Sequence, residues 1–320
     1  MTLTLLVALG ALTGCNPTEP EPEVVDMRQE FPAPADGALV WDTPEWIIGA
    51  YEEKQFCLVL TYDGPDVGIT GQSNYQSEGG HHVVIFGTTT TERDLADGTD
   101  WDCTTTEQLS MTDLDPIIIG GESEDMADGG VTNRFALPEG MAAPLKSGQR
   151  IVVQSHYINA TPNPILIQDQ AQLEVIPEAD VVTWAAPLVN TVTDDLLIPA
   201  NDPAFNLTFD CAFEDPYTVL FIGGHMHEWG TAFQTRFTNA TTEDTEIIYD
   251  VPEWDPYMRD APPFANYDDG AFKVEAGDRL TTSCTWDNDE DHDLTFPGEM
   301  CVTFGMVYPT KVPVICVPEI

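Results

Sequence analysis

Basic residues are scarce in this chain of 320 residues. Lysine and arginine together number 11, against 55 aspartate and glutamate residues, so the formal net charge is −44. A surface this acidic repels phosphate backbones, so the sequence predicts no nucleic-acid partner and no charge-driven docking on anionic lipid. The acidity favours solubility, for instance in a salty medium, over a site that recruits cations.

Long apolar segments are also missing. The run from Leu3 to Leu12 is too short to span a bilayer as a helix, and no other stretch is long and apolar enough. The run ends in "LTGC", which resembles a bacterial lipobox with Cys15 as the lipidated residue. We therefore expect a lipoprotein signal peptide over 1–15, export to the bacterial cell envelope, and membrane contact only through the lipid anchor. Because no lysine or arginine precedes the run, an ordinary cleaved signal peptide is the alternative.

Helical periodicity is absent from every long segment. Short apolar runs alternate with clusters of turn-forming residues, and the 25 prolines and 24 glycines are spread throughout. Runs such as "FCLVLTY", "RIVVQSHYI" and "YTVLFIGG" therefore predict strands. Residues 16–30, rich in proline and glutamate, predict a solvated tether. The expected fold is all-β, of sandwich or jelly-roll type, with a boundary near 176–187 that separates domains over 31–178 and 179–320.

Cysteine is limited to seven residues. Without Cys15 six remain, and an even number in an exported chain indicates disulfides, with fifteen pairings open from spacing alone. No two of them form a CxxC pair, which argues against a thiolate zinc site.

Histidine is limited to six residues, and two of them stand one residue apart in "GGHMHEWG". His225 and His227 follow a predicted strand, where residues i and i+2 point to the same face. Their imidazoles are therefore expected to form a two-histidine clamp on one metal. The alternative is a pair of surface histidines at a strand end.

The other histidines carry less information singly than together. His81 and His82 are neighbours at the start of a predicted strand, so both can reach one metal only if the backbone bends, which the two preceding glycines permit. His156, in "VVQSHYIN", would alone be read as a core or edge histidine, and His292, in "DNDEDHD", as a solvated one. Five of the six histidines fall on three predicted strands, and this concentration favours metal sites.

A methionine adds chemical information. Met300 precedes Cys301 at the head of the predicted strand "MCVTFGMVYP". A thioether is a soft ligand that suits Cu(I) and is a poor ligand for zinc, magnesium or calcium. Methionine alone is usually core filler, so its position beside the histidine motifs is what matters.

The ordered set of motifs resembles a known family. An HH pair, a later HY-containing strand, an HxH pair and a downstream E-M-C are similar to the copper type II, ascorbate-dependent monooxygenases, which include peptidylglycine α-hydroxylating monooxygenase and dopamine β-hydroxylase. The resemblance covers roughly residues 31–320. It implies two tandem jelly-roll domains with a cleft between them, one copper ion in each domain, and ascorbate or another one-electron reductant as co-substrate.

The resemblance also implies roles for particular residues. His81, His82 and His156 match the copper that stores and delivers an electron. His225, His227 and Met300 match the catalytic copper, where dioxygen binds and a substrate C–H bond is attacked. The implied disulfides are Cys57–Cys103, Cys211–Cys316 and Cys284–Cys301.

Three positions depart from the peptide-hydroxylating enzyme. Gly223 stands where that enzyme has an arginine for the peptide carboxylate, and Val302 and Phe304 replace an asparagine and a tyrosine. The departures argue against a peptide with a C-terminal glycine as substrate and favour a neutral, cationic or aromatic substrate. The stretches "EMCV" and "HYIN" are more similar to the dopamine-hydroxylase branch. Two alternatives to an enzyme stay open: a copper-binding lipoprotein for storage, delivery or sensing, and a zinc-bound adhesion or structural domain.

Overall fold

The computed structural model describes residues 23–88, 96–104, 114–118, 122–125, 131–193, 195–259, 261–267, 270–296 and 298–317. The expected signal peptide over 1–15, the lipidation site Cys15 and residues 16–22 lie outside this described part. Within it, no helix is long and apolar enough to cross a membrane.

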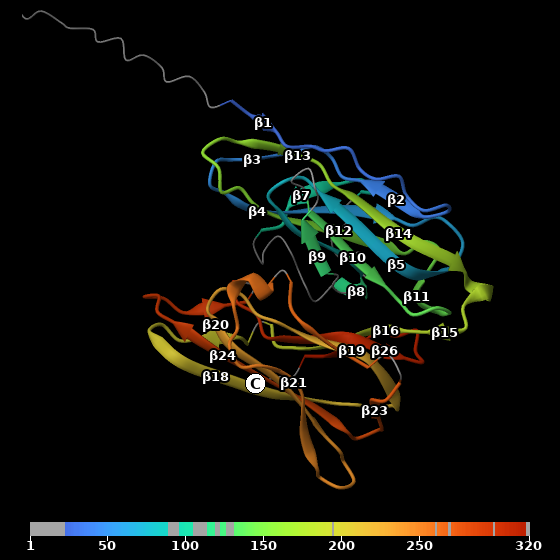
Figure 1. Cartoon of the computed structure of the whole chain (residues 1–320), viewed down its shortest axis with the longest axis vertical. Helices are drawn as coiled ribbons and strands as arrows, with labels where there is room; N and C mark the ends of the chain where they lie inside the picture. Colours follow the sequence, from blue (N-terminus) through green and yellow to red (C-terminus); the bar gives the residue numbers. More distant parts are fainter. Residues whose placement is uncertain are drawn as a thin grey trace, which may run out of the picture.

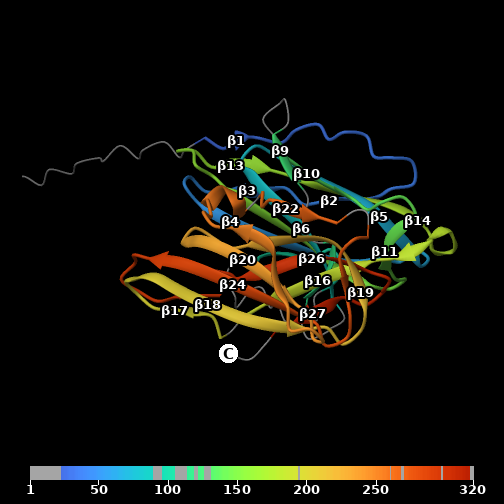
Figure 2. The same ribbon diagram turned by 60° about the horizontal axis from the view of Figure 1, so that its bottom comes forward.

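The chain folds into two β-rich lobes that lie side by side (Figures 1 and 2). The first lobe runs from β1 (Val25–Asp26) to β15 (Thr183–Trp184), and the second from β16 (Ala186–Thr191) to β27 (Val314–Cys316). Across the described residues, the helical elements are the short 3₁₀ turns η2 (Glu178–Asp180) and η3 (Pro256–Arg259). The all-β prediction is confirmed, because short apolar runs separated by proline and glycine cannot sustain helices but do pair as strands.

Two large sheets build the first lobe, and a small three-stranded sheet lies at one end of it. The seven-stranded sheet contains β2 (Leu39–Asp42), β5 (Val67–Gln76), β9 (Glu122–Asp125), β10 (Val131–Ala136), β11 (Met141–Leu145), β14 (Gln170–Pro177) and β15. The five-stranded sheet has the order β7 (Asp100–Asp102), β4 (Glu53–Thr61), β12 (Arg150–Ile158), β6 (Gly80–Thr88) and β8 (Leu114–Ile118). The small sheet joins β1 to β13 (Ile165–Ile167) and β3 (Trp46–Ile48).

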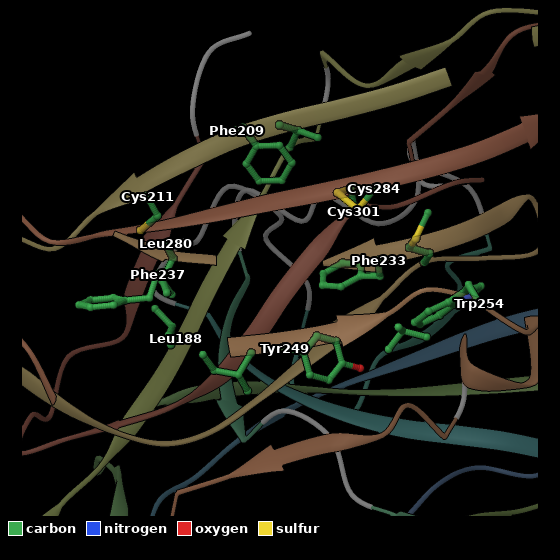
Figure 3. Close-up of a cluster of buried hydrophobic side chains, with 14 of the residues drawn as sticks. Leu188, Phe209, Cys211, Phe233, Phe237, Tyr249, Trp254, Leu280, Cys284 and Cys301 are labelled. Atoms are coloured by element: carbon green, nitrogen blue, oxygen red, sulfur yellow. A yellow bond between two sulfur atoms is a disulfide. The ribbon is translucent and has the colours of Figure 1, made fainter. Parts of the chain in front are cut away.

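The second lobe repeats this plan. Its six-stranded sheet contains β16, β19 (Tyr217–His225), β22 (Phe264–Asn266), β23 (Lys273–Val274), β26 (Val302–Tyr308) and β27. Its four-stranded sheet has the order β18 (Asp202–Ala212), β24 (Arg279–Asn288), β20 (Gly230–Thr238) and β21 (Thr245–Val251), and β17 (Leu197–Ile198) pairs with β25 (Leu294–Thr295). The core of this lobe is rich in aromatic rings, among them Phe209, Phe233 and Tyr249 (Figure 3).

An apolar cluster also crosses from one lobe to the other. Phe221 and Phe304 of the second lobe belong to the same buried cluster as Ile69 and Val153 of the first. The rings of Phe135 and Phe221 are 5.6 Å apart. The two lobes therefore bury a shared apolar surface on this side, and the expected cleft between them stays a prediction.

The division between the lobes can be located by strand pairing. Strand β15, inside the expected boundary region 176–187, still pairs with β11 of the first lobe, whereas β16 pairs with β26 of the second. The domain limits 31–178 and 179–320 themselves stay predictions.

The described end of the expected tether over 16–30 contacts the first lobe. Strand β1 pairs in parallel with β13, and Arg28 forms ion pairs with Asp26 and Glu45. Although rich in proline and glutamate, this segment offers main-chain groups that extend the small sheet. Among the described residues, strand pairing therefore begins at Val25, ahead of Phe31, and the limits of the tether stay a prediction.

Three disulfides are present, in the pairs that the resemblance implied. The Cα separations are 5.9 Å for Cys57–Cys103, 5.6 Å for Cys211–Cys316 and 6.0 Å for Cys284–Cys301. Disulfides of this kind persist in oxidising compartments, so they indicate an extracytoplasmic environment.

Candidate functional site

The HMH motif lies at one edge of the six-stranded sheet of the second lobe, where β19 ends and β26 begins. His225 is the last residue of β19 and pairs with Val302, the first residue of β26. Met226 is 0% exposed and packs in the core of the second lobe. Because side chains alternate along a strand, the two flanking histidines point away from that core, as the spacing predicted.

The two imidazoles face each other through their Nε2 atoms. These atoms lie 3.1 Å apart. On the opposite side of each ring, Nδ1 of His225 lies 3.1 Å from the carbonyl oxygen of Arg259, and Nδ1 of His227 lies 3.0 Å from that of Gly298. A carbonyl oxygen can only accept, so each Nδ1 must donate a proton. Two neutral rings of this tautomer leave two Nε2 lone pairs facing one another.

Such a pair of lone pairs is unfavourable unless a cation lies between them. A second proton is disfavoured at His227, because burial lowers its pKa well below the usual value and the neighbouring His225 lowers it further. Metal-bound histidines characteristically donate their remote N–H to a carbonyl or a carboxylate. The geometry therefore fits a metal ion held by both Nε2 atoms.

Glu299 organises the segment around this pair. Its carboxylate is 0% exposed and accepts the main-chain N–H groups of His227, Trp229 and Met300 at 3.0–3.2 Å. The indole of Trp286 donates a fourth hydrogen bond at 2.9 Å. Burial raises the pKa of this carboxyl to about 7, although its four donors oppose the shift. One side chain thus fixes the relative position of the HMH turn and the main chain of Met300.

The segment carrying Met300 is fixed from a second direction. Cys301, the next residue, is bonded to Cys284 on β24, and both are 0% exposed. Whether the sulfur of Met300 completes the ligand set with the two imidazoles stays a prediction.

A backbone irregularity shapes the first site. Along the β6–β12 pair, His82 pairs with His156, but Tyr157 pairs with Gly80, so His81 is an extra residue in β6. Such a β-bulge bends the strand and redirects its side chains. It is the bend that two adjacent histidines need in order to approach a common point, and Gly79 beside it has φ +87°.

The bulge brings three rings together. The ring centroids of His81 and His156 are 5.4 Å apart, and those of His82 and His156 are 4.9 Å apart. His156 is only 2% exposed, and burial lowers its pKa to about 4, so this ring is neutral.

The tautomer of His156 follows from its contacts. Its Nε2 lies 2.8 Å from a carboxylate oxygen of Glu53, which can only accept, so Nε2 carries the proton. Its Nδ1 is buried and has no hydrogen-bond partner among the described residues. A carboxylate that orients one nitrogen while the other presents a lone pair is the arrangement found behind metal-bound histidines.

Among the residues with described side chains, no three His, Cys, Asp or Glu form a closed metal-binding group. The second site contributes only two such side chains, with a thioether expected as the third donor. The first site contributes three imidazoles that are neighbours but do not form such a group among the described residues. Both ligand sets therefore stay predictions. His292 is 64% exposed and lies beside Asp291, so it takes no part in either site.

The position of Gly223 is enclosed by aromatic rings. A Cβ atom there would lie 2.8 Å from the ring of Phe304 and 3.2 Å from that of Phe264. Gly223 and His225 are two residues apart on β19 and lie on the same face of the strand. A side chain as large as arginine does not fit beside these rings in this arrangement.

Sequence reasoning missed several groups around the two sites. Arg259 is 6% exposed and forms an ion pair with Glu228, and its guanidinium lies 3.6 Å from Glu53. Glu53 and Arg259 were not signalled by any motif, because they are distant in sequence from the histidines they contact. Glu299 could have been noticed as the first letter of E-M-C, but its burial could not.

The fold is that of a β-sandwich protein, and the facing imidazoles of His225 and His227 fit a metal ion. Residues 185–320 match the family model described as copper type II ascorbate-dependent monooxygenase, C-terminal domain. This match agrees with the HxH and E-M-C motifs in the second half of the chain, and copper is the metal that the family implies.

The remaining comparisons add little. No curated protein matches the chain significantly. Among solved structures, a triple jelly roll protein of an archaeal virus turret shares 9% identity over 85% of this chain, with a TM-score of 0.23. PNGF-II shares 9% identity over 90% of this chain, with a TM-score of 0.34. The chain spans 61% and 63% of these two structures. With TM-scores this low, neither likeness bears on function.

Proposed function

We propose that the protein is a copper-dependent monooxygenase. It hydroxylates a C–H bond of a small organic substrate with dioxygen and an external one-electron reductant such as ascorbate, and it uses two copper ions. The observation that carries the proposal is the facing Nε2 pair of His225 and His227, 3.1 Å apart with both Nδ1 atoms held by carbonyl oxygens.

The residues of the two lobes have different tasks in this proposal. Copper, when bound, supplies one-electron chemistry and dioxygen activation. His225, His227 and Met300 hold the catalytic ion, and the thioether favours its reduced state. His81, His82 and His156 hold the ion that delivers the second electron. Glu53 keeps His156 in the tautomer whose Nδ1 is unprotonated and can offer a lone pair to a metal ion.

The surroundings of Gly223 support a substrate without a carboxylate. The rings of Phe264 and Phe304 occupy the space where an arginine would lie, and the nearby Arg259 is paired with carboxylates. We therefore favour a neutral, cationic or aromatic substrate, and an enzyme more like dopamine β-hydroxylase than like the peptide-hydroxylating enzyme.

The same proposal includes the cellular setting. The three disulfides are consistent with export. A lipid on Cys15 would hold the enzyme at the bacterial cell envelope, with residues 31–178 and 179–320 as the two copper domains.

The test is copper titration combined with oxygen uptake. We expect two Cu(II) ions per chain, with nitrogen hyperfine structure in the electron paramagnetic resonance (EPR) spectrum, and ascorbate-driven oxygen consumption that depends on substrate. His225→Ala should lose one copper and all uptake, whereas the control His292→Ala should retain both.

Two outcomes would contradict the proposal. Two bound coppers without oxygen consumption for any C–H substrate in a panel of aromatic and aliphatic amines, alcohols and hydrocarbons would favour storage, delivery or sensing. Binding of zinc with no affinity for copper would favour an adhesion or structural domain.

A further inference from the structure

Arg259 connects the two histidine sites across the lobe interface. Arg259 belongs to η3, the one-turn helix on the side of the second lobe that faces the first (Figures 1 and 2). Its Nη1 atom is bonded to Glu228 of its own lobe and lies 3.6 Å from Glu53 of the first lobe. Glu53 in turn accepts from His156, and Glu228 is the residue after His227.

The main chain of the same residue contacts the second site directly. The carbonyl oxygen of Arg259 accepts from Nδ1 of His225 at 3.1 Å. Arg259 therefore orients one histidine of the second lobe through its backbone. Through its side chain and Glu53 it reaches a histidine of the first lobe.

The burial of the Arg259 side chain makes its contacts with the two carboxylates important for the packing of the lobes. The side chain of Arg259 is 6% exposed, while those of Glu53 and Glu228 are 49% and 44% exposed. A guanidinium withdrawn from water needs its carboxylate partners, and removing it leaves those partners to repel one another across the interface. Separation of the lobes at this end would have to break the contact with Glu53.

We propose that Arg259 is a positioning residue that holds the two histidine sites at a fixed separation. The inference rests on the proposed function for its consequence, because transfer of an electron between two copper ions depends on their distance. The linkage itself is a property of the protein without metal.

A solvent-exposed ion pair between the lobes provides a matched control. Lys311 of the second lobe lies 2.7 Å from Glu178, at the end of the first, and the two side chains are 40% and 39% exposed. Exposed pairs of this kind contribute little to stability. Lys311→Met therefore removes an inter-lobe cation without touching either histidine site.

The first experiment uses the metal-free protein. Urea unfolding is measured for Glu53→Gln, Arg259→Met and the double variant. We expect the two changes to be coupled by about 10-fold in the unfolding equilibrium constant, as for contacting charges of which one is buried. The cycle of Glu178→Gln with Lys311→Met should show a few-fold coupling at most. Additive effects of Glu53→Gln and Arg259→Met would overturn the linkage whatever the protein does with copper.

The second experiment measures the separation of the sites. Pulsed EPR on the Cu(II)-loaded protein should give one narrow copper–copper distance in the unmodified chain and in Lys311→Met. A broadened or longer distribution is expected for Arg259→Met, with both coppers still bound, and Arg259→Lys should restore part of the narrow component. An unchanged narrow distance in Arg259→Met would refute the positioning role. Failure to load two coppers would count against the proposed function, while the urea cycle would still decide the role of Arg259.

Discussion

Individual carboxylate side chains hold their neighbours in place at both sites by accepting hydrogen bonds. Glu299 accepts from the main chain of His227 and Met300, and Glu53 accepts from His156. In each case a carboxylate fixes a candidate ligand segment without being a ligand itself. The chemistry of the two sites therefore depends on acids that the histidine pattern does not reveal.

Replacing the thioether of Met300 should separate the effect on copper binding from the effect on turnover. Met300→His keeps a donor atom but replaces sulfur by a harder nitrogen. Copper should still bind, because His225 and His227 remain, while ascorbate-dependent oxygen uptake should fall by about 100-fold, at the upper end of losses seen for changes around metal ligands. Copper content and uptake are measured on the same preparation. Full uptake in this variant would show that Met300 has no catalytic role.

A buried acid behind His156 predicts a pH dependence of stability. Asp169 is 1% exposed, accepts from Tyr157, and lies 3.4 Å from Nε2 of Gln76, which also contacts the carbonyl oxygen of His156. Burial raises its pKa from 3.8 to about 6. Between these values the unfolded chain loses the proton first, so the fold loses stability as pH rises through this window.

The prediction is tested with an uncharged replacement. Relative to Asp169→Asn, the unmodified metal-free protein should lose about 2 kcal/mol of unfolding free energy between pH 4 and pH 6. Urea unfolding at a series of pH values measures the difference, with Asp36→Asn, at an exposed carboxylate, as the control. Parallel curves for the Asp169→Asn variant and the unmodified protein would show that Asp169 does not stay protonated in the fold.

At the scale of strands, the sequence pattern was a good guide wherever apolar residues were continuous. The run "RIVVQSHYI" coincides with β12, and "YTVLFIGG" with all of β19 but its last residue. Strand β5, "VGITGQSNYQ", carried no such signal, yet it pairs with β10, β11 and β14. Its Gln72, Asn74 and Gln76 are buried, which a strand pattern based on apolar residues cannot anticipate.

The close pairing of β19 and β26 sets the second site, and it depends on a glycine. A Cβ atom on Gly305 would lie 2.2 Å from the main-chain oxygen of Phe221. Gly305→Ala must therefore shift the backbone of β19, and we expect a loss of stability of about 3 kcal/mol or more together with weaker copper binding. Gly223→Ala is the comparison, since the atoms nearest to its Cβ would belong to the side-chain rings of Phe304 and Phe264 and not to the main chain.

Thermal unfolding and copper titration of the two variants measure the effect. Gly305→Ala should lose much more stability than Gly223→Ala, because a main-chain atom cannot rotate away from the new methyl group while a side-chain ring can. If both variants lost the same stability, strand spacing would not be the cause.

At the scale of the whole molecule, composition predicted the fold class but not how the two lobes pack against each other. Scarce helical periodicity and frequent turn residues indicated β-sandwiches, and the E-M-C and HxH motifs indicated the family that residues 185–320 match. The apolar contact between Phe135 and Phe221 and the ion pairs of Arg259 join residues far apart in the chain. Such contacts depend on how two finished lobes meet, and no local pattern encodes that.

The pairing of β1 with β13 limits how far the protein can reach from a surface. If Cys15 carries a lipid, ten residue steps separate the anchor from Val25, where the first described strand begins. Even fully stretched, that span is at most about 36 Å. The protein could then rotate and shift about its lipid anchor, but it could not leave the layer nearest the membrane. Small molecules would have to diffuse to the enzyme, since the enzyme could not travel to them.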